Sequence, residues 1–300
     1  MDLEKVSKRH WWRTWKLYLL LAVIVVVIVV IVVPLAVLLP RHHHSTPAAT
    51  VILPLYIYPT SDALWSPLFD ALAARPDLNF TIIVNPQSGP GPSPYPGDAW
   101  AGGVAKLNAY DNVRTVGYIP THYAARNLSD VLADVATYAG WALNSTSIAV
   151  DGIFFDEAPY VYSASAAEYM RTIDAVVKNT TGFMGERTVI HNPGTIPDAG
   201  LNDTNLDVVV VFEDDYSSWL NRSASVEALP QVKGSDRANY SVMINSLPAS
   251  VNKNKATLES FVDSLSKVAE YIFVTNSTQN FYESFSSDWL DFVAAMPTNA

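Results

Sequence analysis

The chain has 300 residues, of which 49% are hydrophobic and 16% charged, with a formal net charge of −10 and no cysteine. This apolar content is enough for a large core, and the lack of cysteine excludes disulfides and thiolate metal sites. Six of the 19 Lys and Arg residues, but only two of the 29 Asp and Glu residues, lie before residue 48, so the remainder is strongly acidic. That balance argues against nucleic acid as a partner.

The N-terminal part is dominated by an uncharged apolar segment, residues 17–39. Its length predicts a single transmembrane helix, and because no small-residue cleavage motif follows it, we expect an uncleaved anchor. Basic residues cluster before this segment and only Arg41 follows it at once, so the positive-inside rule places residues 1–16 in the cytosol. The sequence therefore predicts a single-pass type II membrane protein whose C-terminal domain is lumenal or extracellular, in the plasma membrane or the secretory pathway.

Residues 40–49 are expected to be a short polar stalk, and residues 50–300 the exported catalytic domain. The three consecutive histidines of the stalk lack further spaced ligands, so we predict no metal site and no cofactor. Eight Asn-x-Ser/Thr motifs all lie beyond the apolar segment, which indicates a glycosylated, extracytosolic domain. They begin at Asn79, Asn127, Asn144, Asn179, Asn202, Asn221, Asn239 and Asn276.

In the exported part, short apolar runs rich in β-branched residues recur about every thirty residues, separated by segments of helical character. Continuously apolar strands that alternate with helices predict a parallel sheet covered on both faces. Eight such units in about 250 residues favour a closed (β/α)8 barrel of the TIM type, and an open, doubly wound α/β sheet is the alternative. The absence of a glycine-rich phosphate loop after any run disfavours a nucleotide-binding version. The runs begin at Val51, Phe80, Val113, Val150, Arg187, Asp207, Tyr240 and Tyr271.

Helices are expected over residues 61–74, 128–141, 164–178, 256–270 and 285–295, with Ser129 as the N-cap of the second. The segments after the fifth and sixth runs are weaker helix candidates. The stretch from Pro86 to Trp100 is rich in proline and glycine and is predicted to be an irregular loop on the rim of the barrel.

Acidic side chains stand at the expected C-terminal ends of two strands, where barrel enzymes assemble their active sites. Strands two apart lie on the same side of the barrel mouth, so these carboxylates could face each other across a substrate. Glycosidic cleavage needs such a pair, one carboxyl to protonate the leaving oxygen and one to act as nucleophile or base. Acids after a strand also cap helices or meet solvent, so one cluster alone would carry little weight. The clusters are Asp156 and Glu157 after the fourth strand, and Glu213, Asp214 and Asp215 after the sixth.

Several motifs surround these acids: LPLYIYP near the start, IIVNP, GYIPTHY, DGIFFDE, HNPG and VVVFED. In combination they resemble the spherulin 4-like proteins of spherulation-specific family 4, glycoside hydrolase family 135, over nearly all of residues 50–295. The resemblance implies a barrel that cleaves α-linked galactosaminogalactan at N-acetylgalactosamine-containing stretches, often from a membrane-anchored position in fungi. It also implies the roles of three acids, with Asp156 as nucleophile, Glu213 as acid/base and Glu157 as a tuning or positioning group.

Polar and aromatic residues at the other strand ends are predicted substrate contacts, because aromatic faces pack on sugar rings and polar groups bond hydroxyls. For the two histidines among them, a packing role is the alternative. Two conflicts remain within the sequence. Neighbouring strand residues point to opposite faces, so Asp156 and Glu157 can both line the site only if the strand has ended, and a glycan on Asn276 at the barrel mouth would obstruct a polymer. The predicted contacts are Tyr58, Asn85, Tyr118, His122, His191, Asn192, Asp214 and Asn245.

The sequence thus predicts a membrane-anchored, endo-acting, α-N-acetylgalactosaminidase-like glycoside hydrolase, with an extracellular polysaccharide as substrate and no nucleic acid as partner. A catalytically inactive carbohydrate-binding or cell-wall protein on the same barrel is the alternative, because fold alone does not establish activity. A metal-dependent deacetylase is disfavoured because no convincing His/Asp ligand set is present. Nothing in the sequence indicates the oligomeric state.

Overall fold

The computed structural model describes residues 49–91, 94–232 and 234–297. The predicted cytosolic N-terminus, the apolar segment 17–39 and the stalk histidines lie outside the described residues. Within the described part, no helix has both the length and the apolar character needed to cross a membrane.

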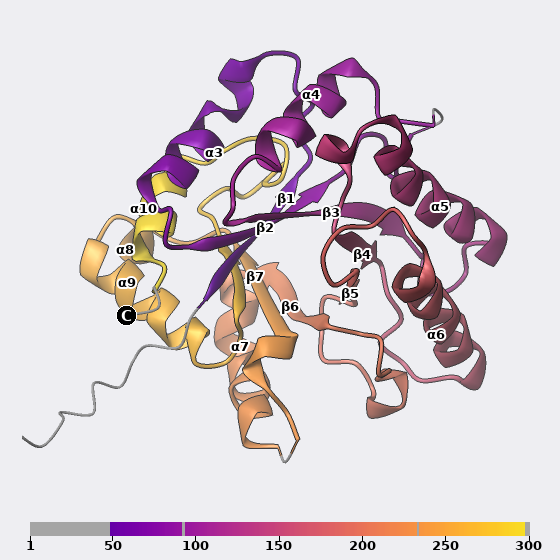
Figure 1. Ribbon diagram of the computed structural model, residues 1–300. Coiled ribbons are helices and arrows are strands. Elements are labelled where there is room, and N and C mark those ends of the chain that lie inside the picture. The colour runs from indigo at the N-terminus through magenta and orange to yellow at the C-terminus, as the bar shows by residue number, and fades with distance from the viewer. Residues whose placement is uncertain (1–48, 92–93, 233, 298–300) are drawn as a thin grey trace, which may run out of the picture. The chain divides into compact units, whose positions relative to one another are not determined.

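Eight parallel strands close into a barrel in chain order (Figure 1). The predicted barrel is confirmed, and the open-sheet alternative is wrong because the first strand pairs with the last, with Thr50 opposite Tyr271 and Val51 opposite Ile272. The strands are β1 (Thr50–Leu55), β2 (Asn79–Val84), β3 (Val113–Pro120), β4 (Gly152–Asp156), β5 (Thr188–Asn192), β6 (Val208–Asp215), β7 (Tyr240–Asn245) and β8 (Tyr271–Val274).

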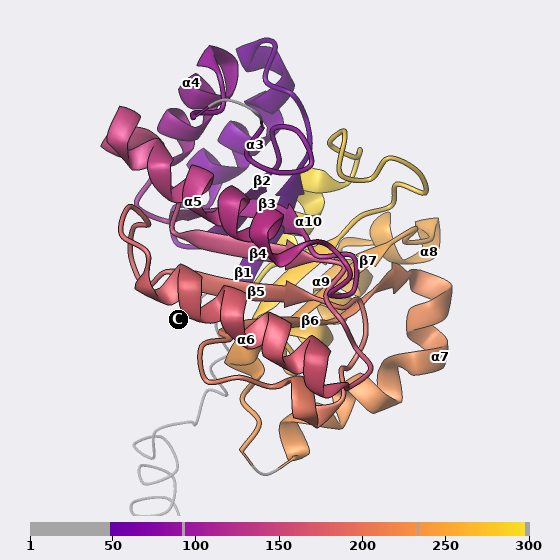
Figure 2. The ribbon, with the colours of Figure 1, turned by 90° about the vertical axis from the view of Figure 1, so that its right-hand side faces the viewer.

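Helices cover the outside of the barrel, and α5 and α6 lie side by side, with α5 against β3 and α6 against β5 (Figure 2). The connection from β5 to β6, which is described throughout, contains only a short 3-10 helix, η3 (Ala199–Leu201). The α-helices are α3 (Asp62–Ala74), α4 (Asp98–Leu107), α5 (Leu128–Asn144), α6 (Ala164–Asn179), α7 (Tyr216–Glu227), α8 (Ala249–Asn252), α9 (Lys255–Ser266) and α10 (Trp289–Ala295).

Some predicted boundaries are wrong. Helix α4 was not expected, because it begins inside the Pro/Gly-rich stretch that was predicted to be an irregular loop. Gly97 has φ 82° and allows a sharp turn directly into the helix. The N-cap of α5 is Asn127 rather than Ser129, since Leu128 already packs against the core in the first turn. Strand β8 ends at Val274, so Asn276 lies beyond the strand end.

Large aromatic side chains pack between the helices and the strands and hold the strand ends in place. Tyr138 of α5 is fully buried, and its hydroxyl donates to the carbonyl oxygens of Val84 and Tyr118 at 3.2 and 3.1 Å. A side chain at Gly117 would lie 2.6 Å from the Tyr138 ring, so β3 needs glycine at this point. Burying one such ring contributes roughly 2–3 kcal/mol. The consequence is a fixed backbone at the C-terminal ends of β2 and β3.

Strand β6 carries a β-bulge. Its register with β7 shifts between Val210 and Phe212, which places one extra residue in β6. Phe212 then packs edge-on against Trp219 of α7, with ring centroids 5.0 Å apart. Because neighbouring residues alternate, Glu213 points to the inside of the barrel.

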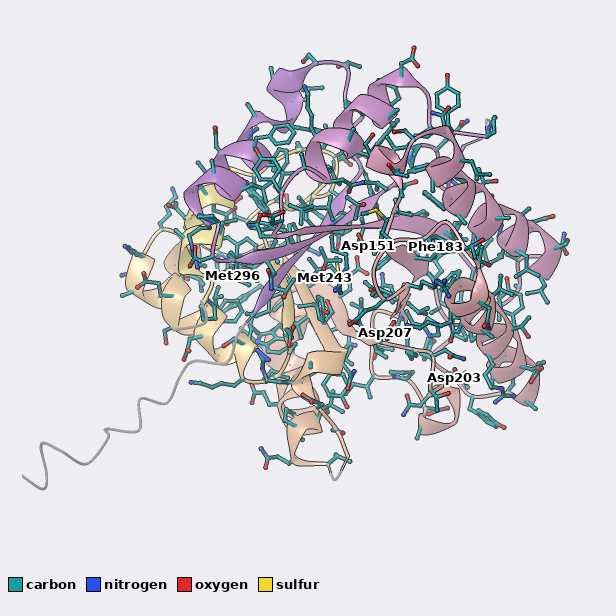
Figure 3. The ribbon with its side chains drawn as sticks, in the orientation of Figure 1. Asp151, Phe183, Asp203, Asp207, Met243 and Met296 are labelled. Carbon is teal, nitrogen blue, oxygen red and sulfur yellow. The ribbon has the colours of Figure 1, made fainter. Side chains whose placement is uncertain are left out.

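At the opposite, N-terminal end of the barrel, a carboxylate has an oppositely charged partner and a backbone donor. Asp151 and Asp207 lie there, just before β4 and β6 (Figure 3). Asp207 Oδ2 accepts hydrogen bonds from Lys178 Nζ at 2.5 Å and from the backbone N–H of Val189 at 2.7 Å. This carboxylate therefore has an opposite charge and a strand amide as partners, as a structural acid requires.

Candidate active site

Two acids from different strands meet at the mouth of the barrel through one amide. Asn192, the last residue of β5, donates from Nδ2 to Asp156 Oδ1 at 2.8 Å and to Glu213 Oε2 at 2.5 Å. Its Oδ1 accepts from the backbone N–H of Gly194 at 3.0 Å, which fixes the orientation of the amide. The structure therefore brings together three predicted site residues that come from β4, β5 and β6.

Two phenols complete the hydrogen bonding of this pair. Tyr118 donates its hydroxyl to Asp156 Oδ2 at 2.8 Å, and Tyr282 donates to Glu213 Oε1 at 2.5 Å. Tyr56 lies between the phenols, edge-on to both, with ring centroids 5.4 Å away in each case. Every carboxyl oxygen of the pair thus accepts at least one hydrogen bond, and the aromatic rings pack around the pair.

Removal of water raises the pKa of both carboxyls. For Asp156, hydrogen bonds from Tyr118, the backbone of Glu157 and Asn192 oppose that rise. For Glu213, the negative charge of Asp156 raises the pKa further, and the bonds from Tyr282 and Asn192 oppose it. Burial also raises the pKa of both phenols well above their usual value, so they stay neutral donors. The site thus contains two carboxyls that compete for one negative charge.

Glu157 lies beside this pair without entering it. Strand β4 ends at Asp156, and Glu157 adopts a left-handed conformation with φ 49°. Its side chain is 41% exposed and forms a hydrogen bond with His122 through Oε2 and Nδ1. Because the strand has already ended, Asp156 faces the inside while Glu157 and His122 stand on the rim.

Two predicted contacts, Tyr58 and Asn85, lie beyond the ends of β1 and β2. Tyr58 is 53% exposed and packs edge-on against buried Trp100 of α4, with centroids 6.1 Å apart. Asn85 Oδ1 accepts from the backbone N–H of Gly89 at 3.1 Å and so holds its own loop. Neither forms a hydrogen bond with the Asp156–Glu213 pair, and both stay predictions as substrate contacts.

Asp214 is the second-last residue of β6, and Asn245 is the last residue of β7. Asp214 Oδ2 accepts from Arg222 Nη1 of α7 at 3.3 Å, and Asn245 Oδ1 accepts from the Ser246 hydroxyl at 2.7 Å. These contacts tie strand ends to the following segments. Asp214 also acts electrostatically on the pair, because its charge raises the pKa of Glu213.

The structure does not bring His191 to this site. His191 precedes Asn192 in β5, points to the opposite face, and contacts Asp174 of α6 with Nε2 2.8 Å from Oδ1. Both side chains are buried, at 6% and 0% exposure. This placement corresponds to the packing alternative for the histidine.

Sequence reasoning missed Tyr282, which lies in the irregular connection between β8 and α10. No periodicity or strand end marks that residue, so a single sequence carries no signal for it. Tyr56, which follows β1 directly inside the LPLYIYP motif, is by contrast one of the strand-end aromatics that the sequence predicts to offer a face to sugar rings.

A groove of about 600 Å³ lies beside α8, α9 and α10 and includes neither acid of the pair among its lining residues. Asn276 is part of it and donates from Nδ2 to the Ser287 hydroxyl at 3.1 Å. The predicted glycosylation motif thus stands apart from the Asp156–Glu213 pair. Within the described residues, no three His, Asp or Glu side chains form a group that could hold a metal ion.

A family model described as spherulation-specific family 4 matches residues 50–296. Among curated proteins, Spherulin-4 of Physarum polycephalum is 38% identical over 177 residues, which make up 58% of this chain and 48% of that protein. The match thus spans about half the length of this relative.

Solved structures give two further similarities. The crystal structure of Aspergillus clavatus Sph3 in complex with GalNAc is 39% identical and has a TM-score of 0.78, covering 84% of this chain and 98% of that one. The β-glucuronidase of Ruminococcus gnavus has a TM-score of 0.50 at 9% identity, covering 83% and 49%. The second similarity shows the barrel fold alone.

Proposed function

The chain belongs to spherulation-specific family 4, and from this premise we propose that it is a glycoside hydrolase acting on an N-acetylgalactosamine-containing polysaccharide. The similar Sph3 structure holds GalNAc, which supports an amino-sugar polymer of the galactosaminogalactan type as the substrate. Fold similarity alone would not support an activity, so the proposal depends on the carboxyl pair.

The observation that carries the proposal is the joining of Asp156 and Glu213 by one amide of Asn192. Both oxygens contact the same nitrogen, at 2.8 and 2.5 Å, so they are no more than about 5.3 Å apart, which fits the short spacing of retaining glycosidases. Inverting enzymes hold a water between carboxyls that are roughly 6.5–9.5 Å apart. We therefore propose a double displacement.

In the first step, Asp156 attacks the anomeric carbon while Glu213 protonates the leaving glycosidic oxygen. Burial raises the pKa of Asp156, and the three hydrogen bonds that it accepts oppose this rise and favour the ionised form that a nucleophile requires. Glu213 suits the acid role because burial and the charge of Asp156 raise its pKa and so favour its protonated form.

In the second step, the glycosyl–Asp156 ester is hydrolysed. Glu213, now ionised, takes a proton from the attacking water, and Asp156 leaves as a carboxylate. The neutral phenol of Tyr118 and the amide of Asn192 donate to the departing carboxylate oxygens and stabilise their returning charge. We assign Glu157 a tuning role, because its charge raises the pKa of Asp156 from the rim.

The runner-up is an inactive carbohydrate-binding protein on the same barrel. One experiment distinguishes the two functions. Purified parent protein and the Glu213→Gln variant are each incubated with galactosaminogalactan, and the new reducing ends are counted. Cleavage by the parent alone supports the hydrolase. Binding of the polymer by a folded parent that releases no reducing ends supports the runner-up.

We also propose that residues 17–39 anchor the barrel outside the cytosol, so that the enzyme acts on a secreted polymer. The uncharged length of this segment and the eight glycosylation motifs beyond it support the proposal. Alkaline extraction of membranes, with endoglycosidase treatment, tests it: we expect a membrane-retained protein whose mass falls on deglycosylation.

A further inference from the structure

Two tyrosines stand exposed on the rim beside the carboxyl pair. Tyr123, in the connection from β3 to α5, is 57% exposed, and Tyr160, in the connection from β4 to α6, is 47% exposed. Their rings meet edge-on, with centroids 6.4 Å apart and planes at 85°. The two rings thus form one continuous exposed aromatic surface rather than scattered side chains, and we name these two residues the aromatic ledge.

The Tyr123 half of the ledge is held by a strained turn. Three consecutive residues, His122, Tyr123 and Ala124, have left-handed φ angles of 49°, 56° and 66°. Each such residue costs roughly 1–2 kcal/mol outside glycine, so the surroundings must enforce the turn. The backbone N–H of Tyr123 donates to the Glu157 carbonyl at 2.6 Å, and that of Ala125 to the His122 carbonyl at 2.9 Å. The turn is thus fixed to the residue that follows the catalytic strand end.

The Tyr160 half is tied to the next connection of the barrel. The Tyr160 carbonyl accepts from the backbone N–H of Asp198 at 2.9 Å, and Asp198 Oδ2 accepts from the N–H of Tyr162 at 2.8 Å. The Tyr162 ring lies so close to Gly200 that a side chain there would come within 2.4 Å of it. Both halves are therefore held in place before any ligand arrives.

The position of the aromatic ledge and the chemistry of its side chains favour a carbohydrate as its ligand. Glu157 and His122, the pair on the rim, come from the same two connections as the ledge, and Glu157 directly follows Asp156, so the ledge continues the site outward from β3 and β4. Two side chains are too small for a stable protein interface, which needs about 800 Å² per partner. They match one sugar ring: in the galacto configuration the hydrogens on carbons 3, 4 and 5 lie on one face, which can rest on an aromatic ring.

We propose that the aromatic ledge is a sugar subsite, which stacks on a residue of the polymer next to the one held between Asp156 and Glu213. One tyrosine offers its face and the other closes the side at a right angle, while Glu157 and His122 accept or donate hydrogen bonds to the ring hydroxyls. The inference rests on the proposed function. It explains how the enzyme would bind a polysaccharide chain rather than a single sugar.

The test measures binding by calorimetry in the full-length, catalytically disabled Glu213→Gln protein. The probes are an oligosaccharide of α-linked N-acetylgalactosamine and the free monosaccharide. Tyr123→Ala and Tyr160→Ala are each expected to weaken oligosaccharide binding about tenfold, which corresponds to roughly 1.4 kcal/mol, and to leave monosaccharide binding unchanged. Tyr123→Phe keeps the ring and should bind as the parent does.

Leu143→Ala supplies a matched control, because Leu143 is 92% exposed near the C-terminal end of α5, away from the barrel mouth. In the active background, the alanine variants of the ledge should raise KM for the polymer and leave kcat unchanged. Oligosaccharide binding that survives both alanine substitutions overturns the ledge, and so does an oligosaccharide that no variant binds. If the oligosaccharide binds through the ledge but the parent cleaves nothing, the ledge stands and the hydrolase proposal fails.

Discussion

The two faces of β5 contact buried carboxyl groups in two different arrangements. On the outer face, His191 pairs with Asp174 at 2.8 Å, and both side chains are buried. On the inner face, the neighbouring residue Asn192 holds Asp156 and Glu213 against each other through one neutral amide. His191 and Asn192 are adjacent in the chain. The first contacts a carboxylate that thereby has a basic partner, and the second contacts two carboxyls that have none.

This difference separates structure from function. A buried acid beside a basic group follows the ordinary requirement that a charge in the interior have a partner. Two buried carboxyls without a basic partner do not stabilise a fold: burial raises the pKa of both, and the charge of Asp156 raises the pKa of Glu213 further. Such an arrangement is typical of a functional site.

The largest expected effect concerns activity at the inner face. Asp156→Asn and Glu213→Gln should each lower the rate of polymer cleavage by about a thousandfold, because each removes one of the two reacting groups. Unfolding free energy should fall by less than about 1 kcal/mol, since each substitution keeps the shape of the side chain and relieves the burial of two carboxyls side by side. Initial rates and urea unfolding measure the two effects. A stability loss as large as the activity loss would contradict a functional inner pair.

The outer pair should show the reverse. Asp174→Ala leaves His191 buried without its partner and is expected to lower the unfolding free energy by about 3 kcal/mol. Activity per folded molecule should stay close to that of the parent. Urea unfolding and active-site-normalised rates decide the matter, and a variant that is stable but inactive would place Asp174 in the catalytic machinery instead.

A third effect is the pH dependence of stability. A carboxyl whose pKa is raised by folding binds more protons in the folded state, so its contribution is present below the unfolded pKa and is lost as pH rises through the folded pKa. Glu213 is such a group. Between the ordinary pKa of glutamate and this raised value, the unfolding free energy should fall with pH less steeply in Glu213→Gln than in the parent. Equal slopes in the two proteins would show that Glu213 is not perturbed.

The smallest effect concerns the basic limb of the pH–rate profile. Tyr282 donates to Glu213, and this bond lowers the pKa of the acid. In Tyr282→Phe, the pKa of Glu213 therefore rises further, and the basic limb should move to higher pH, with a loss of rate of about tenfold at most. Profiles of kcat/KM measure the shift. Movement to lower pH would contradict the assignment of Glu213 as the acid.

The barrel was predictable because its signal is local: each strand is a continuous apolar run, and all eight were found. The ends of elements were not, since Asn127 and Ser129 are equally good caps and only the packing of Leu128 selects one. The start of α4 depends on a glycine turn at Gly97 that composition alone does not reveal.

The site was partly predictable for the same reason. Asp156, Asn192 and Glu213 end or nearly end apolar runs, but which face each side chain takes depends on strand register. The bulge in β6 sets that face for Glu213, and the left-handed turn at Glu157 decides that this acid leaves the pair for the rim. Tyr282 comes from an irregular connection, where folding alone determines its position.

The most direct test of the two-carboxylate site is to trap its covalent intermediate. Glu213→Gln protein is mixed with an N-acetylgalactosamine oligosaccharide that carries an activated aryl leaving group, which departs without an acid. Because the general base for the second step is also missing, we predict that a glycosyl group accumulates on the peptide containing Asp156, where mass spectrometry locates it. Glycosylation of Glu157 instead, or a parent enzyme whose first product has the inverted anomeric configuration, would contradict the account.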